Sequence, residues 1–90
     1  MVSAEICGNS LCEAGIYEGD LAVIELTNEA TNGDLVAILT PEGMQAKFYY
    51  QEKNGDIRLE SRNCLYETKI YCPSAVCVQG VVREINRQLK

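Results

Sequence analysis

Two residues in this chain have types and surroundings that could do chemistry together: Ser10, in the segment 7–11, and Lys47, in the segment 44–48. The chain contains no histidine, so it cannot by itself build a Ser-His-Asp triad, a Cys-His dyad or a histidine metal site. A neutral lysine can replace histidine as the base that activates a serine. The sequence therefore points to a Ser-Lys dyad with Ser10 as nucleophile and Lys47 as general base.

Such a dyad requires Lys47 to lose its charge. An exposed lysine has a pKa of about 10.4, and lowering it to about 7 requires roughly 4–5 kcal/mol of destabilisation of the ammonium form. Burial without a carboxylate partner has this effect, and the neighbours Ala46 and Phe48 bring no counter-charge. Attack by the serine on a carbonyl group gives a tetrahedral intermediate with a negatively charged oxygen. This oxyanion needs backbone N–H donors, for which Asn9 and Ser10 are the candidates.

Each residue also has an ordinary interpretation. Gly, Asn and Ser all favour turns, so residues 8–10 could be only a turn. Lysines are mostly exposed, so Lys47 could lie on the polar face of a strand. A plain β-barrel binding module with a coincidental serine and lysine therefore stays open, and the choice depends on the rest of the sequence.

Size and charge limit the class of protein. Ninety residues make one domain with a modest core. Eight basic against 13 acidic residues give a net charge of −5, which argues against direct binding to nucleic acid or to an anionic membrane. There is no apolar run of about 20 residues and no signal peptide at the start. We therefore expect a cytoplasmic protein without a membrane anchor.

The five cysteines are an odd number, so they cannot all pair within the chain. They are Cys7, Cys12, Cys64, Cys72 and Cys77. With no export signal, reduced thiols are expected. The loose C-x4-C spacings leave redox and zinc roles open, but small, buried structural thiols are favoured. We expect no metal and no cofactor.

Turn residues recur at short intervals along the chain, and strand-like runs lie between them. Asn54-Gly55 is a strong hairpin signal, and the nearly all-apolar run 35–39 suits a strand covered on both faces. Strand-like segments cover residues 21–26, 35–39, 44–50, 56–61, 69–71 and 76–85, with a short helical turn within 11–17 and a frayed tail or helix end over 84–90. This spacing predicts a small, mostly β domain with at most one or two short helical turns.

Taken in order, these segments resemble the self-cleaving LexA/UmuD family. Residues 7–23 resemble its nucleophile region: Gly and one variable residue before the serine, then an acidic-Gly-Asp turn and an apolar strand. Residues 32–37 resemble the family's Gly-Asp strand entrance, and residues 44–47 resemble the strand that carries its lysine. Residues 58–66 resemble the next strand and an Asn-x-x-Tyr loop, and residues 78–82 the closing strand.

The distance between the two reacting residues also agrees with the family. Ser10 and Lys47 are 37 positions apart, which is the family's Ser-to-Lys spacing. The chain departs from the family pattern at Leu11, where Met is usual, at Cys64, where Pro is common, and at Phe48, where a basic residue is frequent. None of these changes removes a reacting group.

The resemblance implies a highly twisted β domain of the LexA and signal-peptidase type, in which residues 1–90 form one Ser-Lys peptidase and dimerisation domain. It implies the catalytic core of a bacterial or phage repressor of the SOS response that cleaves its own interdomain bond. It also implies a homodimer, stimulation by a RecA filament, and DNA contact only through an N-terminal domain absent here. With nine residues before Ser10, we expect that the chain cannot cut itself.

Two related functions remain open within the same resemblance. One is a UmuD-like subunit of an error-prone DNA polymerase. The other is a catalytically silent dimerisation domain, as in some phage-type repressors. A signal peptidase shares the Ser-Lys chemistry, but the sequence has no membrane anchor.

Overall fold

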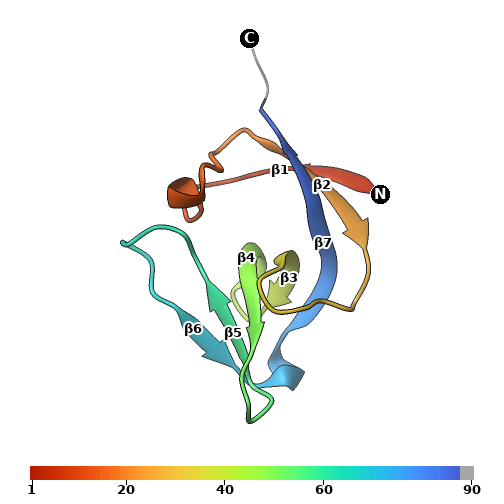
Figure 1. The fold of residues 1–90 in the computed structure, drawn as a ribbon, viewed down its shortest axis with the longest axis vertical. Helices are drawn as coiled ribbons and strands as arrows, with labels where there is room; N and C mark the ends of the chain where they lie inside the picture. Colours follow the sequence, from red (N-terminus) through yellow and green to blue (C-terminus); the bar gives the residue numbers. More distant parts are fainter. Residues whose placement is uncertain (88–90) are drawn as a thin grey trace.

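A single antiparallel sheet of seven strands carries the fold in the computed structural model, which describes residues 1–87 (Figure 1). The spatial order of the strands is β1-β2-β7-β3-β4-β5-β6. They are β1 (Val2–Glu5), β2 (Leu21–Leu26), β3 (Leu35–Thr40), β4 (Gly43–Gln51), β5 (Ile57–Glu60), β6 (Lys69–Tyr71) and β7 (Cys77–Asn86). The helical segments of the described residues are two 3-10 turns, Cys12–Ala14 and Pro73–Ala75, and none is long and apolar enough to cross a membrane.

The prediction of a mostly β domain is confirmed, and most segments lie where the sequence places them. The predicted helical turn is the 3-10 turn at Cys12–Ala14. The predicted strand 76–85 is confirmed as β7, which runs to Asn86. The overlapping prediction of a frayed tail or helix end is wrong over residues 84–86, because these residues pair with Leu21–Val23. Of the rest of that predicted tail, Arg87 lies outside any strand, and residues 88–90 lie outside the described part of the chain.

Strand β1 is an addition that the sequence did not predict. All four of its residues are exposed, so it lacks the alternation that marks a half-buried strand. It forms because its backbone pairs with β2, from Val2 opposite Ile24 to Glu5 opposite Leu21. Backbone pairing leaves no pattern in the side chains when neither face is buried.

Strand β3 is covered on both faces, as its apolar sequence predicts. Leu35 and Ala37 pack into one cluster of apolar side chains. Val36 and Ile38 are both fully buried in a second cluster on the opposite face. This strand therefore forms the centre of the domain, with β7 on one side and β4 on the other.

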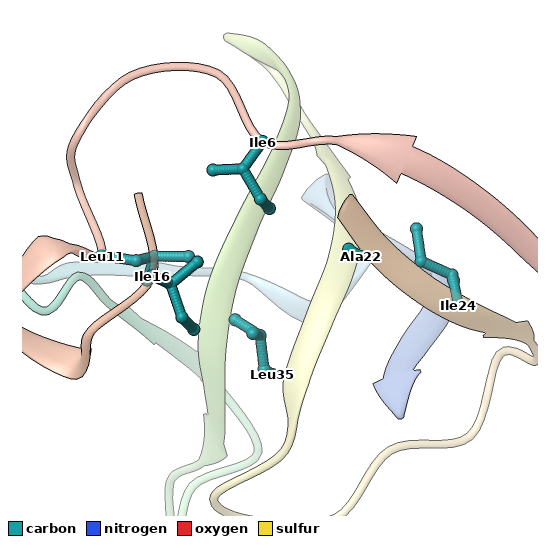
Figure 2. Close-up of a cluster of buried hydrophobic side chains, with 6 residues drawn as sticks. All are labelled: Ile6, Leu11, Ile16, Ala22, Ile24 and Leu35. Carbon is teal, nitrogen blue, oxygen red and sulfur yellow. The ribbon is translucent and has the colours of Figure 1, made fainter. Parts of the chain in front are cut away.

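The first apolar cluster attaches the N-terminal loop to the sheet (Figure 2). Three of its members, Ile6, Leu11 and Ile16, come from the segment between β1 and β2. They pack with residues of β2 and β3: Ala22, Ile24 and Leu35. The segment that carries Ser10 is therefore held against the sheet by apolar contacts on both sides of the serine.

Two β-bulges twist the sheet where β7 pairs with its neighbours. The register shifts between Val23 and Ile24 of β2 and again between Ala37 and Ile38 of β3. Bulges increase the local right-handed twist of a sheet. The two ends of the sheet consequently curve apart, with β1 and β2 on one side and β5 and β6 on the other (Figure 1).

All five cysteines are free thiols in the structure, and Cys12 is the most covered of them. The expectation that they are buried apolar residues is wrong for the other four, which are exposed. Those four lie in loops or at the start of a strand, where the side chain meets solvent.

Candidate active site

Ser10 lies in the loop that follows β1, directly before the deeply buried Leu11. The Leu11 side chain is only 2% exposed, whereas Ser10 is half-buried. Gly8 opens the loop with a φ of 78°, a left-handed conformation that glycine adopts without a steric cost. The loop thus turns sharply before the serine and is anchored immediately after it.

The loop around Ser10 is fastened to the segment that follows β5. The Arg62 N–H donates to the Ser10 carbonyl at 2.7 Å, and the Glu13 N–H donates to the Arg62 carbonyl at 2.6 Å. The Asn63 side-chain amide donates to the Asn9 carbonyl at 2.8 Å. These bonds join positions 49 to 54 residues apart, so the fold, and not local sequence, sets the place of the serine.

The carbonyl oxygens of Asn9 and Ser10 are used in this way, but their N–H groups are not. Within residues 1–87 neither N–H donates a hydrogen bond. The preceding N–H, that of Gly8, is engaged by the Glu18 carboxylate at 3.0 Å. The two donors expected to stabilise an oxyanion therefore remain available to a ligand.

Lys47 lies on β4, one residue beyond the last pair that β4 makes with β5, Phe48 opposite Glu60. Its amine donates a hydrogen bond to the Ser61 hydroxyl at 2.7 Å. The Tyr66 ring lies over the amine, with 5.3 Å between Nζ and the ring centroid. In the described part of the chain no carboxylate lies within ion-pair distance of the amine.

This environment disfavours the charged form of Lys47. Partial burial lowers the pKa of the amine, and the positive charge of Lys69 lowers it further. The Ser61 hydroxyl is a neutral partner, so it does not restore the charge as a carboxylate would. The direction of the pKa change is the one that a lysine base requires.

Ser10 and Lys47 line the same cleft, which has a volume of about 360 Å³. One wall runs from Ala4, at the end of β1, to Leu11 in the loop that follows. The other is the first part of β4, from Met44 to Lys47, with Tyr66 beside it. Apolar side chains from β2, β3 and β7 also line it: Ala22, Ile24, Ala37 and Val82.

The structure thus brings Asn9, Ser10 and Lys47 to one cleft. It does not join the serine to the lysine, since no hydrogen bond links the two side chains among the described residues.

The wall formed by β4 has an unpaired backbone edge. Residues 43–48 pair with β3 on one side, but on the other side β5 pairs only with residues 48–51. Within residues 1–87 no other segment pairs with this edge between Gly43 and Lys47. The cleft therefore presents free backbone N–H and C=O groups next to the lysine.

Ser61 is the residue of this site that the sequence interpretation missed. A signal for it existed in the predicted hairpin, because pairing of the two strands around Asn54-Gly55 brings residues near 61 opposite Lys47. That signal depends on the length of the turn and is lost if the turn length is misjudged by one residue.

The fold and this cleft define a serine peptidase-type domain. Comparison with known proteins identifies the class: the chain belongs to the Peptidase S24-like family, whose model matches residues 1–83. The predicted resemblance to LexA-type peptidase domains is thereby confirmed.

Individual relatives make the assignment more specific. The chain is 36% identical over 84 residues to a LexA repressor of Erythrobacter litoralis, covering 93% of this chain and 36% of the relative. It is 40% identical over 83 residues to a LexA repressor of Pelagibacter ubique, covering 92% and 37%. It is 51% identical over 59 residues to that of Clostridium acetobutylicum, covering 66% and 28%. The aligned part of the chain therefore spans between 28% and 37% of the length of these relatives.

Proposed function

We propose that this domain is the self-cleaving catalytic core of a LexA-like repressor and that Ser10 and Lys47 are its catalytic residues. The observation that carries the proposal is the position of the Lys47 amine: it lies in the same cleft as Ser10, is partly buried, and has no carboxylate partner in the described residues. A surface lysine of ordinary function would have its amine in water or against an acidic side chain.

In the proposed reaction, the Ser10 hydroxyl attacks the carbonyl carbon of a peptide bond while its proton moves to the neutral Lys47 amine. The negative charge that develops on the carbonyl oxygen accepts hydrogen bonds from the N–H groups of Asn9 and Ser10. Lys47 then gives its proton to the departing amine, and water hydrolyses the acyl-serine by the reverse proton path.

The shape of the cleft favours an extended peptide as substrate. An extended chain can pair with the unpaired edge of β4 at residues 43–47, which would align its backbone beside Lys47. The apolar lining of the cleft suits small or apolar side chains on either side of the cleaved bond. Both features agree with a cleaved peptide bond that lies in an extended segment of a LexA-like repressor.

The names of the relatives support a repressor over a polymerase subunit, since each of the three proteins compared is a LexA repressor. On this basis we propose a role in the SOS response, with activation by a RecA filament and DNA contact through a separate domain. We also propose a homodimer. The family resemblance implies a dimer interface in the region of the closing strand, which is β7 here. Since β7 has a strand on each side, such an interface would use the face of the sheet and not a strand edge.

Labelling with a fluorophosphonate tests the dyad directly. The Ser10 oxygen displaces fluoride from phosphorus and Lys47 takes its proton, so intact-mass spectrometry detects one adduct. We expect labelling that increases with pH and disappears in Ser10→Ala and Lys47→Ala. Ser3→Ala and Lys53→Ala, at exposed positions away from the cleft, should label like the wild type. A chain that does not label at any pH would instead be a silent dimerisation domain.

Peptide cleavage is tested separately. The chain is incubated at alkaline pH with a peptide in which two small residues, Ala and Gly, flank the bond and apolar residues lie beyond them, as the lining of the cleft favours. The products are identified by mass spectrometry. Cleavage that requires both Ser10 and Lys47 supports the proposal. Labelling without cleavage of any such peptide would contradict the proposed substrate while leaving the dyad intact.

A further inference from the structure

Ser61 occupies a position from which it can fix the geometry of the lysine. The β4–β5 ladder ends with Phe48 opposite Glu60. One further step in this register places Lys47 opposite Ser61, and directly opposed side chains in an antiparallel pair lie on the same face. The 2.7 Å bond from the Lys47 amine to the Ser61 hydroxyl follows from this arrangement.

The backbone of Ser61 is fixed from both directions. On one side, Glu60 is held in the ladder by its pairing with Phe48. On the other side, the N–H of Arg62 donates to the carbonyl of Ser10 at 2.7 Å. Ser61 thus lies between Glu60, which pairs with the lysine-bearing strand β4, and Arg62, whose N–H binds the loop that carries the nucleophile.

The Arg62 side chain reinforces this connection. Its guanidinium group lies over the Phe48 ring, with 4.2 Å between Cζ and the ring centroid. It also donates to the Tyr50 hydroxyl at 3.0 Å and to the Glu60 carboxylate at 2.9 Å. Arg62 therefore ties the end of β5 to β4 through its side chain and to the Ser10 loop through its backbone.

The chemistry of a hydroxyl suits a partner of a neutral base. A neutral amine has two N–H groups and one lone pair. If one N–H donates to Ser61, the amine loses rotational freedom while its lone pair stays available to accept the serine proton. A carboxylate at the same place would hold the amine equally well but would stabilise the ammonium form and remove the base at neutral pH.

We propose that Ser61 is a positioning residue for the Lys47 base, holding the amine by an uncharged hydrogen bond so that its lone pair can face Ser10. This inference rests on the proposed Ser10–Lys47 function. Among the described residues, the groups around the amine that can titrate or carry charge are Lys69 on β6, Tyr66 in the loop between β5 and β6, and Glu5 and Cys7 on the opposite wall of the cleft.

Three substitutions at Ser61 separate this role from a structural one. Ser61→Ala removes the hydroxyl, and the fluorophosphonate labelling rate should fall about 3- to 10-fold, the worth of one net hydrogen bond. Ser61→Thr keeps the hydroxyl and should restore most of the rate. Ser61→Asp places a carboxylate beside the amine, so its labelling should need a higher pH than the wild type and recover at alkaline pH. Ser74→Ala, an exposed serine outside the cleft, is the matched control.

The pH dependence of the labelling rate distinguishes a positioning role of Ser61 from a structural one. A structural role for Ser61 would lower the thermal midpoint in Ser61→Asp without moving the pH dependence of labelling. The inference is overturned if Ser61→Ala labels at the wild-type rate, or if the profile of Ser61→Asp coincides with that of the wild type. Failure of the proposed function looks different, because then the wild type itself does not label at Ser10.

Discussion

Arg87 and Asp20, 67 positions apart in the sequence, are joined at the rim of the sheet by an ion pair of 3.2 Å between Nε and Oδ1. The Asp20 side chain is only 4% exposed, and its carboxylate also accepts the Tyr17 N–H at 2.9 Å. Arg87 donates further to the Gly15 carbonyl at 3.0 Å. The end of β7 is thereby fastened to the segment that connects the serine loop to β2.

Asp20→Asn should therefore destabilise the domain in a pH-dependent way. The Tyr17 N–H and, next, Arg87 lower the pKa of Asp20 below its ordinary value. A lowered carboxyl pKa contributes stability that is present above the unfolded value of about 4 and is lost as the pH falls through the folded value. Urea denaturation should show a less stable variant at pH 7 and a smaller difference at pH 3. Glu29→Gln, an exposed carboxylate, is the control; a difference that does not change with pH would contradict the assignment.

Lys47→Met should stabilise the domain at neutral pH while abolishing labelling. Because burial lowers the pKa of Lys47, the unfolded chain binds the proton more readily than the folded chain, and the stability of the wild type increases with pH. We expect the variant to be more stable by about 1 kcal/mol at pH 7, in the range of single stabilising substitutions. The difference in the free energy of unfolding between the variant and the wild type should become smaller towards pH 10.

Chemical denaturation at both pH values measures this difference. Lys53→Met, at an exposed position in the β4–β5 turn, should change stability little at either pH. A Lys47→Met variant that is less stable than the wild type at pH 7 would show that the amine is not destabilised by its surroundings.

Gly80→Ala should be strongly destabilising. A Cβ atom at this position would overlap with Cγ2 of Ile24 and would lie 2.7 Å from the backbone oxygen of Glu25. The second contact is with backbone, so a side-chain rotation cannot relieve it, and β2 must move away from β7. We expect a loss of about 2–3 kcal/mol in the free energy of unfolding. Gln79→Ala, at the exposed neighbouring position, should cost little in the same denaturation experiment.

Asn63→Asp should slow the labelling of Ser10 with little effect on stability. The replacement has the same shape, but it puts a carboxylate oxygen where the Asn63 amide donates to the Asn9 carbonyl at 2.8 Å. The bond that Asn63 accepts from the Leu65 N–H is retained. We expect the labelling rate to fall about 3- to 10-fold. Asn28→Asp adds the same charge at an exposed site and is the control; equal rates in both variants would mean that this bond does not order the loop.

The sequence predicts the strands of this domain well where their side chains are half-buried. Strand β3 reads as apolar because it is covered on both faces, and β2 coincides with the predicted segment. Strand β1 could not be predicted, since its exposed residues carry no alternation. The predicted strand 76–85 ends one residue before the observed end of β7 at Asn86, although its pairing with β2 includes a register shift at Val23 and Ile24 that the sequence does not show.

The candidate site shows a similar division. Residue types and the absence of histidine suggest Ser10 and Lys47 as catalytic residues without any structure. The identification of Ser61 as the partner of the lysine requires the register of one hairpin to be known. A two-residue Asn54-Gly55 turn would place Lys47 opposite Arg62. In the structure the loop covers residues 53–55, as the bond from the Glu52 N–H to the Asp56 carbonyl shows, and Ser61 moves into place. A difference of one residue in a turn thus decides which side chain meets the amine.

The unpaired edge of β4 has a consequence for the behaviour of the isolated domain. An open strand edge can recruit a strand of another molecule and seed aggregates, and natural proteins limit this hazard by keeping such edges short or charged. Between Gly43 and Lys47 the edge is brief and Lys47 is its single charged residue. Because Lys47 is half-buried and its ammonium form is disfavoured, the short length of this edge, more than its charge, limits self-association.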